Sequence, residues 1–87
     1  MYQLLGGVTM NTYFGQIGGK LRQIRLDKGY TLETVAEKIG LTIKAIQLYE
    51  MGQRKISNPT IAKLLKIYHY DLDQFWDETK IYLDSED

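Results

Sequence analysis

The sequence predicts an all-α domain built from five helices. Apolar side chains recur at helical spacing in successive segments of the 87-residue chain, and no segment has the period-two alternation of a strand. Glycine, threonine or serine separates these segments at the positions where helices end or begin. A chain of this length is expected to form one domain around one shared core.

The first helix is expected from about Thr12 to Lys28, and Gly29 supplies a left-handed stop after it. Its apolar stripe repeats at i, i+4 and i+7, and it consists of Ile17, Leu21 and Ile24. Three glycines in its first half each weaken a helix by up to about 1 kcal/mol relative to alanine: Gly15, Gly18 and Gly19.

Two short helices follow, each with a threonine at its N-cap and a glycine at its end. They are expected over about 32–39 and 43–51, with Thr31 and Thr42 as the caps. Neither is long enough to be stable alone. Two helices joined by so short a turn cross steeply, and the small side chain of Ala36 allows close approach. The pattern therefore predicts a helix-turn-helix.

The last two helices are marked by a proline and a second turn. Ser57 or Asn58 caps the fourth helix, and Pro59 lies in its first turn, where the missing N–H costs nothing. Its buried stripe is Ile61, Leu64, Leu65 and Tyr68. After a turn at 69–71, the fifth helix begins near Leu72 and carries on one face Phe75, Trp76, Thr79 and Leu83.

Charge is unevenly distributed along the chain although the net charge is zero. Residues 17–70 hold ten basic and four acidic side chains, a net of +6, whereas residues 71–87 hold one basic and seven acidic, a net of −6. This asymmetry predicts a domain that faces a polyanion and is followed by an acidic tail. The alternative is a solvated surface on which like charges cluster by chance.

We expect the helical domain over residues 12–76. Residues 1–11 are expected to form an N-terminal extension without charged side chains, in which Met10 is either an alternative start or the true one. Residues 77–87 form an acidic C-terminal extension.

The composition excludes several classes of protein. The chain has no cysteine, which excludes disulfides and thiolate metal sites and fits a reducing compartment. No apolar run approaches the roughly 18–20 residues of a membrane span, and the N-terminus lacks the basic start of a secretory leader. The single histidine, His69, has no partners at metal-ligand spacing, and no catalytic constellation is recognisable. We expect a cytoplasmic protein that is not an enzyme and has no metal or cofactor.

The third helix has an unusual outward face. With Ile46 toward the core, the rotation of about 100° per residue turns Ala45, Tyr49 and Glu50 inward. The outward side chains are one cation, one amide and two apolar groups: Lys44, Gln47, Leu48 and Met51. Such groups can contact base edges and thymine methyls in a major groove.

Four stretches resemble one known family: IGGKLRQIR at 17–25, GYTLETVAEKIGLT at 29–42, AIQLYEMGQR at 45–54 and ISNPTIAKLLKIYHYDLDQF at 56–75. They are similar to the Cro/repressor-type (xenobiotic-response-element family) helix-turn-helix DNA-binding domains of phage and bacterial regulators. The resemblance implies a lambda-repressor-like fold. Leu32 departs from it where a glutamine is common, and Leu48 where a polar residue is usual.

The resemblance and the helical phase together imply roles for individual residues. We expect base contacts from Thr42, Ile43, Lys44, Gln47 and Leu48, with a phosphate contact as the alternative for Lys44. Contacts to phosphate are expected from Thr31, Gln53, Arg54 and Lys55. The resemblance also implies a structural ion pair between Arg25 and Glu50.

The implied function is a homodimeric transcription regulator, expected to be a repressor, that binds a palindromic operator in double-stranded DNA. The expected dimer interface is on the fifth helix, at Leu72, Phe75, Trp76 and Leu83. One alternative is the controller protein of a restriction–modification system. Another is an antitoxin-like module whose acidic C-terminus binds a basic partner protein.

Overall fold

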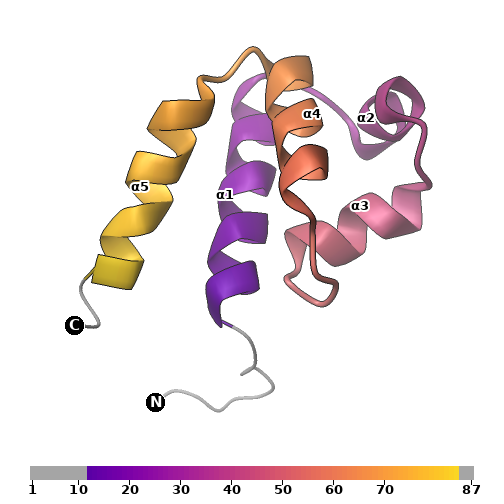
Figure 1. Cartoon of the computed structure of the whole chain (residues 1–87). Coiled ribbons are helices and arrows are strands. Elements are labelled where there is room, and N and C mark those ends of the chain that lie inside the picture. The colour runs from indigo at the N-terminus through magenta and orange to yellow at the C-terminus, as the bar shows by residue number, and fades with distance from the viewer. Residues whose placement is uncertain (1–11, 85–87) are drawn as a thin grey trace.

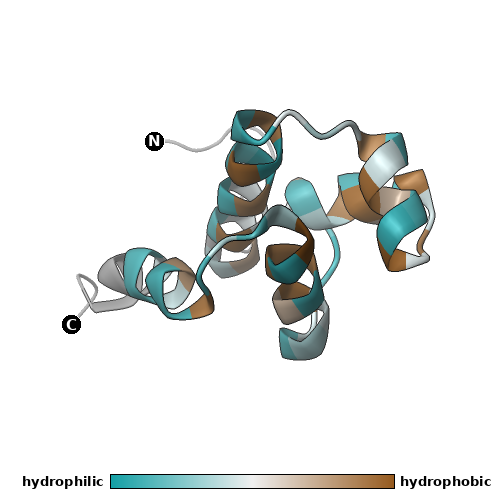
Figure 2. Cartoon of the chain, turned by 90° about the horizontal axis from the view of Figure 1, so that it is seen from above, coloured by the Kyte–Doolittle hydropathy of each residue, from teal (hydrophilic) through white to brown (hydrophobic). Residues whose placement is uncertain are grey.

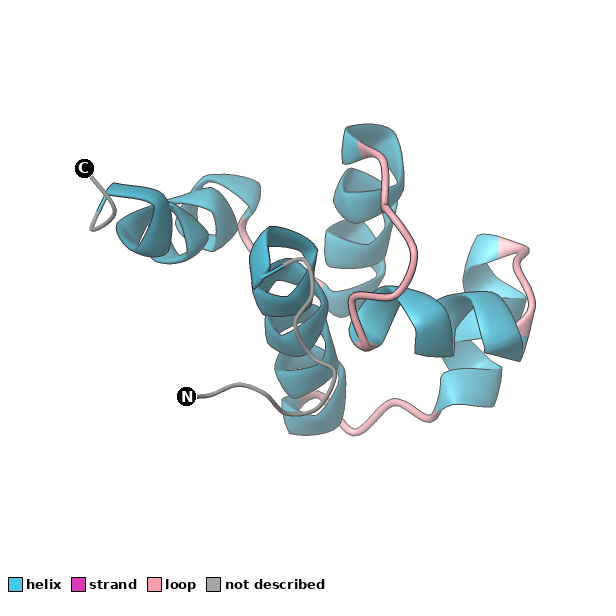
Figure 3. Ribbon diagram, turned by 90° about the horizontal axis from the view of Figure 1, so that it is seen from below, coloured by secondary structure: helices cyan, strands magenta, loops and turns pink. Residues whose placement is uncertain are grey.

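The chain folds into the five helices that the sequence predicts. The computed structural model describes the backbone of residues 12–84 and the side chains of residues 13–79. Within these residues every regular element is a helix (Figures 1 and 3), and the elements are α1 (Thr12–Asp27), α2 (Leu32–Ile39), α3 (Ile43–Glu50), α4 (Asn58–Tyr68) and α5 (Leu72–Asp84). The all-α prediction is therefore confirmed.

Helix α1 is the central element of the arrangement. It packs against α3, α4 and α5, while α2 packs against α3 and α4. The α2–α3 pair lies on one side of α1 and α4, and α5 lies on the other side (Figures 1 and 3). Consequently α3 and α5 occupy opposite ends of the molecule.

Side-chain caps set the start of three helices. The hydroxyl oxygens of Thr31, Thr42 and Ser57 accept the N–H groups of Thr34, Ala45 and Thr60 at 3.1, 3.0 and 3.3 Å. Ser57, and not Asn58, is thus the cap of α4. The C-cap of α4 is His69, which adopts a left-handed φ of 56° without being a glycine.

All five helices and the loop residue Ile56 contribute buried side chains to one core, and hydrophobic and hydrophilic positions are mixed along each helix (Figure 2). Tyr68 is fully buried, and its ring lies 5.8 Å from that of Tyr30. Among the described residues its hydroxyl has no hydrogen-bond partner, and burial raises the pKa of Tyr68 because the phenolate would be desolvated.

Two of the α1 glycines lie where backbones meet. A Cβ on Gly18 would overlap the carbonyl oxygen of Tyr49 and lie 2.8 Å from that of Glu50. A Cβ on Gly52 would lie 2.6 Å from the Cα of Gly15, and Gly52 has a φ of 72°. The C-terminal end of α3 therefore rests directly on the α1 backbone, which explains why a helix would retain residues that weaken it.

Helix α5 is anchored to α1 by one aromatic side chain. Phe75 is 0% exposed, and Thr79, whose hydroxyl donates to the Phe75 carbonyl at 2.9 Å, is also buried. The prediction that Phe75 belongs to a dimer interface is wrong, because its ring fills the core of its own chain. Trp76 is half-buried with its ring edge-on to Phe75, and Leu72 is exposed, whereas the side chain of Leu83 lies outside the described residues.

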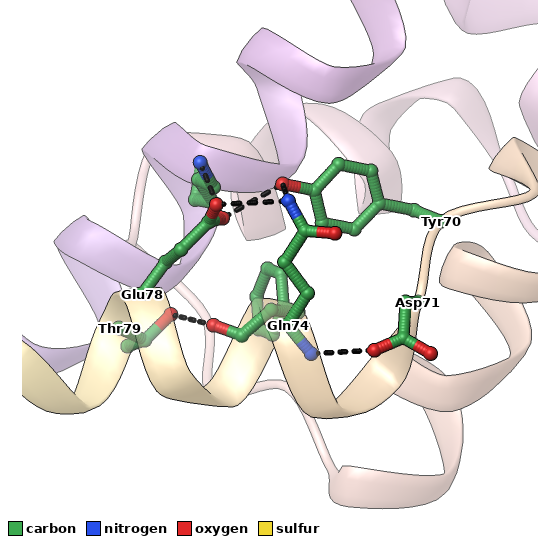
Figure 4. Close-up of polar contacts among 7 residues, drawn as sticks. Tyr70, Asp71, Gln74, Glu78 and Thr79 are labelled. Carbon is green, nitrogen blue, oxygen red and sulfur yellow. Dashed lines mark hydrogen bonds and ion pairs between the residues drawn. The ribbon is translucent and has the colours of Figure 1, made fainter.

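A polar cluster closes the outer edge of the α1–α5 contact (Figure 4). The Glu78 carboxylate lies 2.7 Å from the Lys20 ammonium and accepts hydrogen bonds from the Tyr70 hydroxyl at 2.7 Å and the Gln74 amide at 3.0 Å. The hydrogen bond from Lys20, followed by those from Tyr70 and Gln74, lowers the pKa of Glu78 to about 2. Helix α5 thus continues, still in contact with α1, past the boundary expected after residue 76.

Substitution of Gly18 tests the backbone contact between α1 and α3. Gly18→Ala should lower the free energy of unfolding by about 2 kcal/mol or more, because the added methyl group must displace backbone atoms that cannot rotate away. Gly19→Ala is the matched control, since a Cβ there meets nothing within 4 Å. Alanine at that position should stabilise the helix by up to about 1 kcal/mol. Equal shifts of the urea midpoint in the two variants would contradict this account.

The polar cluster predicts an acid-sensitive contribution to stability. The pKa of Glu78 is lower in the folded chain than its ordinary value of 4.5, so its contribution is complete above pH 4.5 and is lost as the pH falls toward about 2. The melting temperature of Glu78→Gln should therefore be lower than that of the original chain at pH 7, and the difference should shrink toward pH 2. Trp76, the single tryptophan, reports this transition from α5 by fluorescence. A difference independent of pH would rule the cluster out as its source.

Candidate nucleic-acid interface

The turn between α2 and α3 is held by one carbonyl. The Ala36 carbonyl accepts the N–H groups of Gly40 at 2.9 Å and Leu41 at 3.0 Å, and Gly40 adopts a left-handed φ of 81°. Thr42 then starts α3 at once. The chain reverses within these few residues, which makes α2, the turn and α3 one compact unit beside α4 (Figure 3).

Helix α3 has one face in the core and one in solvent. Ala45, Ile46 and Glu50 are buried, and Tyr49 is half-buried against the core. Four of the five predicted base-contacting residues are exposed, and Leu48 is half-buried: the exposed ones are Thr42, Ile43, Lys44 and Gln47. The helix contains a single acid, Glu50, and that acid faces inward. The solvent face of α3 is therefore free of negative charge.

Met51 is the most exposed large apolar side chain beside this face, at 59%. The helical phase correctly placed Met51 on the outward face of the third helix, although no DNA contact was assigned to it. Its spacing of seven residues from Lys44 explains this position, because residues i and i+7 lie on the same side of a helix.

The start of α3 is more favourable for an anion than the start of α2. The first turn of a helix has free N–H groups and a partial positive charge. Glu33 lies in the first turn of α2, whereas α3 has no acid in its first turn. The Thr31 hydroxyl also donates to the Thr34 hydroxyl at 2.9 Å, so a phosphate at α2 would be met by backbone groups and not by this side chain.

The loop after α3 presents the predicted phosphate-contacting residues. Gln53, Arg54 and Lys55 are all exposed. The backbone of this loop is fixed at both sides, because the Gln53 N–H donates to the Leu48 carbonyl at 3.0 Å and Ile56 is buried in the core. Two cations are thus held next to the C-terminal end of α3.

The Arg25–Glu50 ion pair connects α1 to α3, as the resemblance implies. Arg25 Nε donates to Glu50 Oε2 at 2.6 Å, and a second guanidinium nitrogen donates to Oε1 at 3.1 Å. The third nitrogen donates to the Tyr30 carbonyl at 2.9 Å, and both charged side chains are buried. The hydrogen bond to the Glu50 carboxylate raises the pKa of Arg25. This pair fixes the rotation of α3 about its axis.

The acidic side chains of α5 lie far from α3. Asp73, Asp77 and Glu78 belong to α5, and Asp71 directly precedes it, at the opposite end of the molecule (Figure 1). The arrangement separates an uncharged or basic face at α3 from an acidic one at α5. A polyanion would be attracted to the first face and repelled by the second.

A profile of the helix-turn-helix family matches residues 21–75, which include α2, the turn and α3. The chain belongs to the helix-turn-helix family. The matched span also includes the C-terminal part of α1, all of α4 and the start of α5.

Individual relatives agree with this assignment. The chain is 36% identical over 61 residues to the HTH-type transcriptional regulator PuuR of Escherichia coli (strain K12), and equally to that of Shigella flexneri. These matches cover 70% of the chain, which spans about a third (33%) of the length of the curated relatives it matches. The relatives are named as regulators and not as enzymes, in agreement with the sequence prediction.

A solved structure shares the helix-turn-helix fold. The crystal structure of the clp gene regulator ClgR from C. glutamicum superposes with a TM-score of 0.75 at 22% identity, covering 85% of this chain and 95% of that one. None of the described helices is both long enough and apolar enough to cross a membrane.

Removal of the carboxylate tests the role of the buried pair. Glu50→Ala should lower the free energy of unfolding by about 3 kcal/mol, because the Arg25 guanidinium would stay buried with one partner fewer. Glu37→Ala, at an exposed acid of the neighbouring helix, is the control and should change it by less than about 0.5 kcal/mol. An unchanged melting midpoint in Glu50→Ala would show that the pair does not hold α3.

Proposed function

We propose that this protein is a sequence-specific regulator of transcription that binds double-stranded DNA through α3. The observation that carries the proposal is the solvent face of α3, which has a cation, an amide and aliphatic groups and no acid. That face belongs to the element that defines the helix-turn-helix family. A helix enters the major groove of B-DNA and reads the base edges there.

The exposed polar residues divide into two groups by their position. Lys44 and Gln47 project from the solvent face of α3, so they would contact base edges, as would Thr42 at the N-terminal end of the helix. Gln53, Arg54 and Lys55 in the following loop, and the N-terminus of α2 at Thr31, would meet phosphates. Phosphate contacts position a protein on DNA without reading its sequence.

We further propose a homodimer that binds a palindromic operator. The supporting observation is the surface of α5, where Leu72 is exposed and Trp76 is half-buried at the end of the molecule opposite α3. Pairing of two copies there would give two recognition helices related by a two-fold axis, each on one half-site. Such a dimer on a promoter would act as a repressor by occupying it.

Selection of bound sequences from random duplex DNA tests the proposal, and a palindromic consensus is the expected result. On the selected site, Lys44→Ala and Gln47→Ala should each cost about 1–3 kcal/mol of binding and relax the preference at one base position. Lys63→Ala, at an exposed lysine of α4, is the matched control and should bind with nearly unchanged affinity. Arg54→Ala should instead weaken binding to all sequences. It should also reduce the slope of log affinity against log salt concentration by about one, the value for one lost phosphate contact. Failure to bind any duplex at low salt would refute the proposal.

A further inference from the structure

We propose that the homodimer forms by exchange of α5. In each copy the turn between α4 and α5 would become helical, and α5 would pack on α1 of the second copy. This inference rests on the proposed homodimer and specifies the contacts that hold it together. It predicts that Phe75 and Glu78 make between two copies the contacts that they make within one chain.

The turn between α4 and α5 differs from the other helix junctions in having no glycine. Each of the first three helices is followed by a glycine with a positive φ, at Gly29, Gly40 and Gly52. After α4 the left-handed residue is His69, with a φ of 56°, and residues 69–71 contain neither glycine nor proline. A left-handed conformation is uncommon outside glycine because Cβ crowds the following carbonyl. A helical conformation, with which this sequence is compatible, would relieve that strain.

The hydrogen bonds of the turn have direct replacements in a helix. The His69 N–H donates to the Lys66 carbonyl at 3.2 Å, and the Tyr70 N–H donates to the Leu65 carbonyl at 2.9 Å. In a continuous helix each N–H donates to the carbonyl four residues earlier, so the same two carbonyls would accept the same two N–H groups in exchanged order. Conversion of the turn therefore leaves neither of these backbone donors unpaired.

The course of the chain explains why a straightened α5 would need a second copy. The chain reverses direction at residues 69–71, which brings α5 back beside α1 (Figure 1). If α4 and α5 formed one continuous helix, α5 would point away from its own α1. Phe75, which is 0% exposed, would then leave the core, and exposure of so large an apolar side chain is unfavourable. The α1 helix of a second copy that has released its own α5 offers the same site.

Exchange keeps the contacts of α5 and adds one. The core position of Phe75 and the 2.7 Å ion pair between Lys20 and Glu78 join α5 to α1, and neither depends on which copy supplies the helix. Leu72, 42% exposed in the single chain, lies directly after the turn, so two continuous helices that cross there would bury it. Strain in a short hinge and this added burial favour exchange. The closed chain is favoured at low protein concentration, because its α5 is tethered beside its own α1.

Reversal of the charges in the Lys20–Glu78 pair distinguishes exchanged from unexchanged dimers. Lys20→Glu and Glu78→Lys each place like charges at the α1–α5 contact. In an exchanged dimer that contains one chain of each variant, one contact joins the two introduced residues and the other joins the two original ones, so both become attractive. Native mass spectrometry of an equimolar mixture should therefore show mixed dimers in about fivefold excess over the two homodimers. A chain with both substitutions, mixed with the original chain, is the matched control and should instead form homodimers.

The outcomes of the mixing experiment separate this inference from the proposed function. Random pairing of the two variants would overturn the exchange and leave the homodimer intact. A mixture that stays monomeric under conditions in which the original chain dimerises would also overturn the exchange. Only monomers of the original chain at tens of micromolar would overturn the homodimer itself.

Substitution of His69 tests the conversion of the turn. Glycine adopts the left-handed conformation without strain and disfavours a helix, whereas alanine favours a helix and disfavours the left-handed conformation. An exchanged dimer contains two converted turns, so His69→Gly should raise the dissociation constant of the dimer about tenfold and His69→Ala should lower it about tenfold, as measured by sedimentation equilibrium. An unexchanged dimer has the same turn as the monomer. Equal dissociation constants in the two variants would therefore overturn the inference.

Discussion

The contact between the C-terminal end of α3 and the first half of α1 is the constraint on which the remaining structure depends. Gly18 allows the α3 backbone to approach that of α1, and Glu50 at the end of α3 is clamped by Arg25. A helix of two turns cannot hold its own orientation, because its own hydrogen bonds are too few to make it stable. These two contacts determine which side of α3 faces water. Lys44 and Gln47 face solvent because the opposite side of α3 is held against α1.

Most of the fold could be predicted from the sequence because its helix ends are encoded locally. Threonine caps and glycine stops marked α2 and α3 within a residue of their observed ends. Three features could not be read in this way. Gly18 has the same local effect on helix stability as Gly19, and only the tertiary contact distinguishes them. His69 ends α4 in a conformation normally expected of glycine, and Phe75 lies on an apolar face whose partner, α1, is distant in sequence.

The exposure of the candidate site residues could be predicted from the sequence, but their hydrogen bonds and local charge environment could not. Helical phase alone placed Lys44 and Gln47 in solvent, because the period of an α-helix is regular. Exposure of the loop residues Gln53 to Lys55 follows from their polarity. The phase could not show that the Thr31 hydroxyl is engaged by Thr34, nor that Glu33 adds negative charge at the start of α2. Such short-range competition between neighbouring polar groups depends on rotamers, which a sequence pattern does not contain.

The central position of α1 affects the spacing between the two α3 helices of the proposed homodimer. In a homodimer joined through α5, the separation of the two α3 helices is transmitted across α1, since α5 and α3 lie on opposite sides of it. The base sequence of each half-site would then depend on α3, whereas the length of the spacer between the half-sites would depend on the packing of α5 against α1. Substitutions in the α1–α5 contact would therefore change the preferred spacer length without changing the base sequence of the half-sites.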